Sequence, residues 1–143
     1  MNLSLKDLRK DFDITSPATS EEIAKVEKHF GWPLPADYKN FLLLTNGLEG
    51  GLSDEYLVLW GTTELIELNL AYKVQDFIQN IIIFGSDGAE EAFAFDISNQ
   101  KSFVVKLPFI GMGYIPNERL ADTFESFLVP KVQPKGFIKR LFS

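Results

Sequence analysis

The sequence predicts a single α+β domain in which N-terminal helices pack on a mainly antiparallel sheet, with a short helix late in the chain. Helical patterns occupy residues 18–47, short apolar runs separated by turns occupy 56–107, and a further helical pattern follows at 123–130. A chain of 143 residues that is 45% hydrophobic can bury one core of ordinary size. We therefore interpret residues 1–143 as one domain.

The N-terminal part of the sequence predicts two helices. The first is short and amphipathic, runs from about Leu3 to Phe12, and is ended by residues 13–17. The second begins after Thr19, which forms a capping box with Glu22, and it ends at Gly31. Its apolar face is formed by Ile23, Val26 and Phe30.

Residues 34–47 predict a third helix with signals at both ends. Pro35 suits the first helical position, Asp37 places a carboxylate near the positive end of the helix dipole, and Gly47 can supply the left-handed residue that closes a helix. The residues that share one buried face at helical spacing are Tyr38, Phe41, Leu42 and Thr45.

The middle of the chain predicts strands. A loop rich in glycine and acidic residues at 49–55 precedes a strand at Tyr56–Trp60, and a helical stretch follows at about 62–72. Ile81–Phe84 is a continuous apolar run, which is the pattern of a strand covered on both faces.

Two more strands complete a predicted meander. Asp87–Gly88 forms the first turn, and in the strand at 92–95 two phenylalanines alternate with two alanines, so that a neighbouring element packs closely on the alanine face. Asn99–Gln100 turns the chain into the third strand at 103–107. The residues expected in the core are Tyr38, Phe41, Ile83, Phe93, Phe95 and Phe127.

A short helix, capped by Thr123 and ended by Pro130, precedes a basic amphipathic tail at residues 130–143. The tail has four basic residues and no acidic one, and its apolar side chains share one helical face. One interpretation is that the tail docks on the core of its own domain, where its cations meet the acidic body. The alternative is an anchor for a membrane or a partner.

The residues available for chemistry are few. The chain has no cysteine and one histidine, His29, which we interpret as an ordinary helix residue. No glycine pair is followed by the helix start and lysine of a phosphate-binding loop. We therefore expect no enzyme, no cofactor and no metal site, with a hydrolase built on paired carboxylates as the remaining alternative. The first 12 residues lack the apolar stretch of a signal peptide and no run reaches membrane-spanning length, so we expect a cytosolic protein.

The charge of the chain favours one class of partner. The formal net charge is −6, and residues 1–130 contain ten basic residues against 20 acidic ones. An acidic body repels phosphate backbones, so a basic protein is a more plausible partner than nucleic acid. The alternative interpretation is that the acidity serves solubility alone.

The candidate partner-binding residues lie in two acidic loops and the strand between them. Loops on a rigid sheet commonly display contact residues, and an aromatic residue can anchor a partner if it is exposed. For the acidic turn the alternative is a solvated hairpin end, and for Trp60 it is a core strand residue. The candidates are Asp54, Glu55, Tyr56, Trp60, Asp87, Glu90 and Glu91.

Five segments, taken in order, resemble the SUKH superfamily. These are residues 18–23, 34–47, 83–88, 93–96 and 123–128, and the resemblance runs from about residue 17 to 129. It implies an α+β fold whose members include bacterial toxin-immunity proteins and fungal cell-wall-assembly regulators. The matching residues are helix ends, core aromatics and turns, so no catalytic role is transferred.

The resemblance suggests two functions. The first is an immunity protein that neutralises a cognate bacterial toxin domain, such as a nuclease, by direct stoichiometric binding. The second is a general protein-interaction scaffold or regulator without a toxin partner. A gene for a large secreted protein with a variable C-terminal domain beside the gene of this chain would favour the first.

Overall fold

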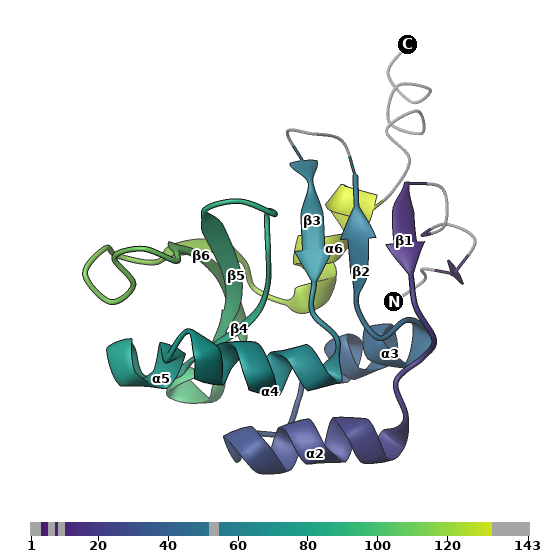
Figure 1. The fold of residues 1–143 in the computed structure, drawn as a ribbon, viewed down its shortest axis with the longest axis horizontal. Coiled ribbons are helices and arrows are strands. Elements are labelled where there is room, and N and C mark those ends of the chain that lie inside the picture. The colour runs from purple at the N-terminus through teal and green to yellow at the C-terminus, as the bar shows by residue number, and fades with distance from the viewer. Residues whose placement is uncertain (1–3, 6–7, 9–10, 52–54, 133–143) are drawn as a thin grey trace.

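A seven-stranded antiparallel sheet organises the domain, and its strand order follows the sequence order (Figure 1). The computed structural model describes residues 4, 5, 8, 11–51 and 55–132. The strands are β1 Phe12–Ile14, β2 Leu48–Gly50, β3 Leu57–Leu59, β4 Ile81–Ser86, β5 Glu91–Asp96, β6 Phe103–Pro108 and β7 Glu118–Ala121. The helices are α2 Ser20–Phe30, α3 Ala36–Leu44, α4 Thr62–Ala71, α5 Val74–Phe77 and α6 Phe124–Val132, with a 3-10 turn at Ser98–Gln100. The predicted α+β fold and the meander of β4, β5 and β6 are confirmed.

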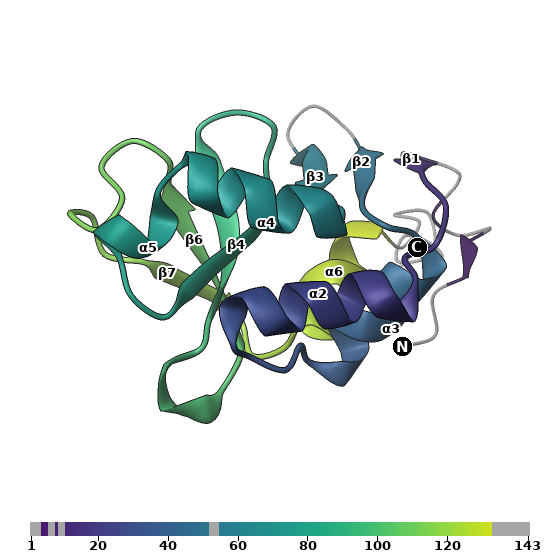
Figure 2. The ribbon, with the colours of Figure 1, turned by 60° about the horizontal axis from the view of Figure 1, so that its bottom comes forward.

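The helix α2 follows its sequence signals closely. The backbone N–H of Glu22 donates to Thr19 Oγ1 at 3.1 Å, and the N–H of Thr19 donates to Glu22 Oε1 at 2.9 Å, which completes the capping box. Hydrogen bonds from the backbone and the side chain of Thr19 to the Glu22 carboxylate lower the pKa of Glu22. At the other end Gly31 adopts a left-handed φ of 62°. Figure 2 shows α2 running alongside α4.

The helix α3 has the predicted buried face but not the predicted ends. It begins after Pro35, which is its N-cap, and ends at Leu44, where Thr45 is already extended. Gly47 therefore does not close the helix. Its φ is 97°, and a Cβ there would lie 2.7 Å from the carbonyl oxygen of Leu59, so this glycine lets the chain pass against the end of β3.

The predicted N-terminal helix is confirmed at Leu5 and Leu8, where the N–H of Leu8 donates to the carbonyl of Ser4 at 3.2 Å, and it is wrong at its C-terminal end. Phe12 belongs to β1 and not to a helix, and the predicted loop at 49–55 begins inside β2. β1 pairs with β2, and β2 pairs with β3, in antiparallel registers. A three-residue strand contains too few residues to show an alternating pattern, so only its partners identify it. Residues 3, 6, 7, 9 and 10 of the predicted first helix lie outside the described residues.

Both faces of the sheet centre are buried. On one face, the rings of Phe84, Phe93 and Phe95 meet aromatic side chains of α3 and α6. On the other face, Ala92 and Ala94 are fully buried, as the alternation predicted. The six residues expected in the core, Tyr38, Phe41, Ile83, Phe93, Phe95 and Phe127, are all buried.

One side chain of α4 forms the hydrogen bonds that a longer β3 would form with β4. β3 is short, and the backbone of Ile83 in β4 bonds instead to the buried amide of Asn69. Asn69 Nδ2 donates to the carbonyl of Ile83 at 2.8 Å, and the N–H of Ile83 donates to Asn69 Oδ1 at 3.1 Å. Because both backbone groups are satisfied, Asn69 fixes α4 to the sheet.

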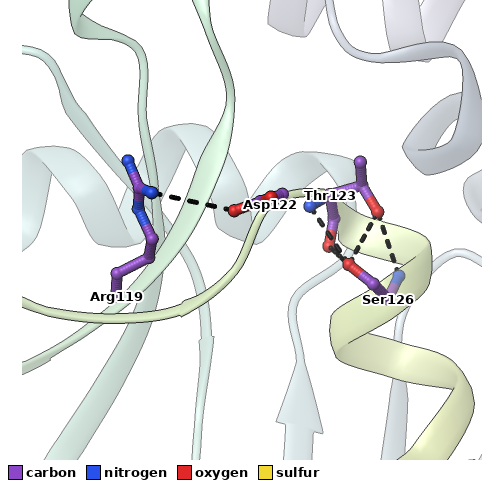
Figure 3. A network of polar contacts seen from close by, with 4 residues as sticks. All are labelled: Arg119, Asp122, Thr123 and Ser126. Carbon is purple, nitrogen blue, oxygen red and sulfur yellow. Dashed lines mark hydrogen bonds and ion pairs between the residues drawn. The ribbon is translucent and has the colours of Figure 1, made fainter.

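The start of α6 is held by three side chains. Thr123 and Ser126 exchange hydrogen bonds between backbone N–H groups and side-chain oxygens, as predicted for a cap at Thr123 (Figure 3). Asp37 of α3 also accepts a bond from the backbone N–H of Glu125, at 2.9 Å. The structure corrects the predicted end of this helix, because α6 continues through Pro130 to Val132. The tail beyond it, residues 133–143, lies outside the described residues.

Candidate protein-binding surface

A row of side chains crosses the first four strands on one face of the sheet. Asp13 of β1 pairs with Glu49 of β2, Glu49 pairs with Val58 of β3, and Val58 pairs with Ser86 of β4. Directly paired residues of antiparallel strands point to the same face with neighbouring Cβ atoms. The exposed carboxylates of Asp13 and Glu49 therefore lie side by side.

Tyr56 connects this row to the turn between β4 and β5. Its hydroxyl donates a short hydrogen bond to Glu49 Oε2. Its ring lies against Gly88, where a Cβ would come within 2.7 Å of Tyr56 Cδ1. The hydrogen bond to Glu49, partial burial, and the charges of Glu49 and Asp13 together raise the pKa of Tyr56.

The turn carries the other predicted carboxylates. Asp87 Oδ1 accepts bonds from the backbone N–H groups of Ala89 and Glu91, at 2.9 and 3.2 Å, so Asp87 also shapes the turn. Glu90 is exposed and Glu91 is half-buried. We call the combined surface the acidic face; it consists of Asp13, Glu49, Tyr56, Asp87 and Glu90. Glu91 lies outside it, because Ala92 pairs with Ser86 of the row and the preceding side chain of β5 points to the opposite face.

The carboxylates of the acidic face lack cationic partners within the described part of the chain. The ion pairs there join Lys39 to Glu27, Lys106 to Glu118 and Arg119 to Asp122. Like charges placed directly opposite each other in a sheet destabilise it. Among the described residues, no ion pair therefore offsets the repulsion between the paired carboxylates of Asp13 and Glu49.

A hollow of about 330 Å³ adjoins the paired carboxylates. Its walls include Asp13 and Glu49 from the sheet and Glu64 from α4. A protruding cationic side chain of a partner would meet three carboxylates at this position.

The structure brings together only part of the predicted site. Tyr56 meets the turn that contains Asp87, Glu90 and Glu91, whereas Asp54 lies outside the described residues. Glu55 is exposed. Trp60 is only 5% exposed, so the alternative interpretation, a core residue, is correct and it cannot anchor a partner.

Trp60 contacts the exposed aromatic residue Tyr72, which follows the last residue of α4. Its ring is stacked on Trp60 at a centroid distance of 6.4 Å and is 45% exposed. Sequence reasoning also missed Asp13 and Glu49, because only the pairing of two very short strands places these carboxylates together.

The described residues offer little for other chemistry. No three histidine, aspartate or glutamate side chains among them converge where they could hold a metal ion. His29 is exposed and contacts the edge of Phe30. Within the same part of the chain, none of the helices combines the length and apolarity needed to span a bilayer.

Comparison with known proteins identifies the family. The model of the SMI1 / KNR4 family (SUKH-1) matches residues 17–129. The chain is also 39% identical over 74 residues to the uncharacterized protein YnaB of Bacillus subtilis (strain 168). That match covers 52% of this chain and 47% of YnaB, so the chain spans about half the length of that relative. Because the family model covers most of the sequence and the predicted SUKH segments occur within it in order, this chain belongs to the SMI1 / KNR4 family (SUKH-1).

Proposed function

We propose that this chain is a protein-binding module that neutralises a bacterial toxin domain by binding it directly in a stoichiometric complex. Membership in the SUKH family supports a role in protein binding. The observation that carries the proposal further is the acidic face. Carboxylates of two neighbouring strands face each other there, at a cost to the fold, on an exposed surface.

A basic toxin domain fits this surface. A toxin that acts on nucleic acid has a cationic substrate channel, which attracts carboxylates over several ångströms and speeds association. Occupation of the channel by the acidic face would exclude the substrate. Burial of Asp13 and Glu49 against cations would also remove the repulsion between them.

We further propose that the module acts in the cytosol and has no catalytic activity of its own. A screen of the purified protein against hydrolase substrates tests the second point. Turnover that disappears on replacing one carboxylate, while the circular dichroism spectrum is unchanged, would support the carboxylate-dependent hydrolase instead.

The substitution Asp13→Lys tests the role of the acidic face. Lysine opposite Glu49 replaces a repulsive pair with an attractive one, so the fold should become about 0.5 kcal/mol more stable. The same change should slow association with the toxin domain encoded beside this chain's gene by at least about threefold and flatten its dependence on salt. Slower association by a more stable protein cannot be explained by unfolding.

The matched control is Glu67→Lys, which reverses an exposed charge on α4 outside the acidic face. Association rates are measured by stopped-flow at several ionic strengths for the three proteins. Equal rates and salt slopes for the wild type and Asp13→Lys would remove the acidic face from the proposal. Consistent absence of a toxin gene beside this gene in related genomes would favour a general interaction scaffold.

A further inference from the structure

A second surface, at the opposite end of the sheet from β1, is strongly apolar. It is formed by the end of α4, by α5 and by residues 109–117 between β6 and β7, the loop at the left of Figure 1. Ile110 is 89% exposed and Tyr114 is 85% exposed. We call this surface the apolar end; its exposed side chains are Leu70, Tyr72, Phe77, Ile110, Tyr114 and Ile115.

The apolar end is held in place by its own contacts. Met112 is buried and fixes the loop to the core, and the ring of Phe109 lies 4.9 Å from that of Tyr72. Gly113 lies so close to α5 that a Cβ would be 2.6 Å from the carbonyl oxygen of Phe77. Because the backbone of this loop is already positioned, little of its conformational entropy is lost when a partner covers it.

The size of the apolar end matches one side of a stable interface. If each fully exposed side chain presents about 200 Å², the exposed fractions of the six residues give about 770 Å². The largest patch on a typical monomer is about 300–600 Å². A standard interface buries about 800 Å² on each partner, so the apolar end is large enough for one.

The charge of the apolar end indicates which partner covers it. Residues 109–117 contain no charged side chain, and the exposed charges at the end of α4 and on α5 are Glu67, Lys73 and Asp76. The next strand, β7, begins with the exposed Glu118 and Arg119, which form ion pairs with Lys106 and Asp122. A basic toxin would be drawn to the acidic face and not to this nearly neutral surface. A second copy of a chain with a net charge of −6 can approach closely only where the local charge is small.

We propose that the apolar end joins two copies of this chain in a two-fold symmetric dimer. Interfaces of homodimers are more apolar than those of transient complexes, and two-fold dimers are the commonest oligomers. A two-fold axis also allows Lys73 of each copy to face Asp76 of the other. Asp13 and Glu49 lie on the first two strands of the sheet, away from the apolar end, and remain accessible in the dimer.

Sedimentation velocity of the full chain, from about 1 to about 200 μM, tests this proposal. We expect the wild type to form a dimer across this range, and Ile110→Asp and Tyr114→Asp each to raise the dimer dissociation constant by at least about tenfold. Both side chains are mostly exposed, so circular dichroism should show an unchanged fold. The matched control is Leu43→Asp, which changes a 46% exposed leucine on α3 and should leave the dissociation constant unchanged.

Two results would overturn the proposal. The first is a wild-type chain that stays monomeric at every concentration, and the second is a dimer that Ile110→Asp and Tyr114→Asp do not weaken. A monomeric wild type whose toxin binding is lost in Ile110→Asp would assign the apolar end to the toxin. Because the readout is self-association, its failure is distinct from failure of the toxin-binding proposal.

Discussion

Replacing Tyr38 with phenylalanine removes a hydroxyl from the centre of the aromatic core. The side chain is 1% exposed, and its hydroxyl has no hydrogen-bond partner among the described residues. The ring lies 4.8 Å from that of Phe124 and 5.0 Å from that of Phe95, and these contacts survive the change. The substitution therefore isolates the effect of one buried oxygen.

The expected change in stability follows from the state of that oxygen. A buried polar group without a partner costs about 1–3 kcal/mol, and the variant should recover part of this while leaving a space of one oxygen atom. We expect Tyr38→Phe to be about 1 kcal/mol more stable than the wild type. For a chain of this size that corresponds to a rise in Tm of about 3 °C.

Urea unfolding followed by circular dichroism measures this difference, with an unchanged m-value as the sign that only stability has changed. The matched control is Tyr114→Phe, since Tyr114 is 85% exposed and its hydroxyl is solvated. A Tyr38→Phe variant that is less stable than the wild type by about 1 kcal/mol would refute the reasoning, because the hydroxyl would then be hydrogen-bonded.

The same pair of proteins makes a prediction for alkaline pH. Burial raises the pKa of Tyr38 above its ordinary value of 10.0. Because the folded wild type holds the hydroxyl in its neutral form, the free energy of unfolding of the wild type is at its full value below pH 10.0. It falls as the pH rises from 10.0 through the folded-state pKa. The advantage of Tyr38→Phe over the wild type should therefore grow as the pH rises above 10.0.

Three further predictions concern contacts that join distant parts of the chain. Asn69→Leu keeps the number and branching of the side-chain heavy atoms but leaves both backbone groups of Ile83 unpaired, so urea unfolding should show a loss of about 3 kcal/mol; a loss below about 1 kcal/mol would contradict the proposed role of Asn69 in binding the edge of β4. Glu27 binds Lys39 Nζ at 3.0 Å, and although partial burial acts to raise its pKa, hydrogen bonds from Lys39 and a backbone N–H hold the pKa below the ordinary 4.5. Because the folded-state pKa is lowered, the stabilisation is present above pH 4.5 and is lost as the pH falls through the folded-state value. Glu27→Gln should thus be about 1 kcal/mol less stable than the wild type at pH 7 and equal to it near pH 3, and a constant difference would exclude this explanation. Gly47→Ala combines a φ of 97° with a Cβ placed 2.7 Å from a β3 carbonyl and should cost more than about 3 kcal/mol, whereas a thermal melt like that of the wild type would show that the chain can move aside.

Local signals in the sequence predicted local structure well. The capping box of Thr19 and Glu22, the buried spacing of Tyr38 and Phe41, and the apolar run of β4 each contain their information within a few residues. The roles of Asn69 and Gly47 could not be predicted in this way. Each depends on a contact with a strand that is distant in the sequence, and no periodicity identifies the partner.

In the candidate surface too, features formed by neighbouring residues were predicted and contacts between distant residues were not. The turn at Asp87 was predicted from its residues, and its contact with Tyr56 comes from the pairing of β3 with β4. The Asp13–Glu49 pair joins residues separated by two helices, so no short-range pattern connects them. Trp60 was ambiguous because an aromatic residue at the end of a short strand can face either way, and here it is covered by Tyr72.

The strand order has a consequence for how the chain folds. β4, β5 and β6 are joined by short turns, so their pairing closes small loops and costs little chain entropy. β1 can pair with β2 only after the intervening segment containing α2 and α3 has been brought into place. We therefore expect the hairpins of β4–β6 to form the folding nucleus and β1 to join last. The edge that carries Asp13 would then be the part of the sheet that opens most readily.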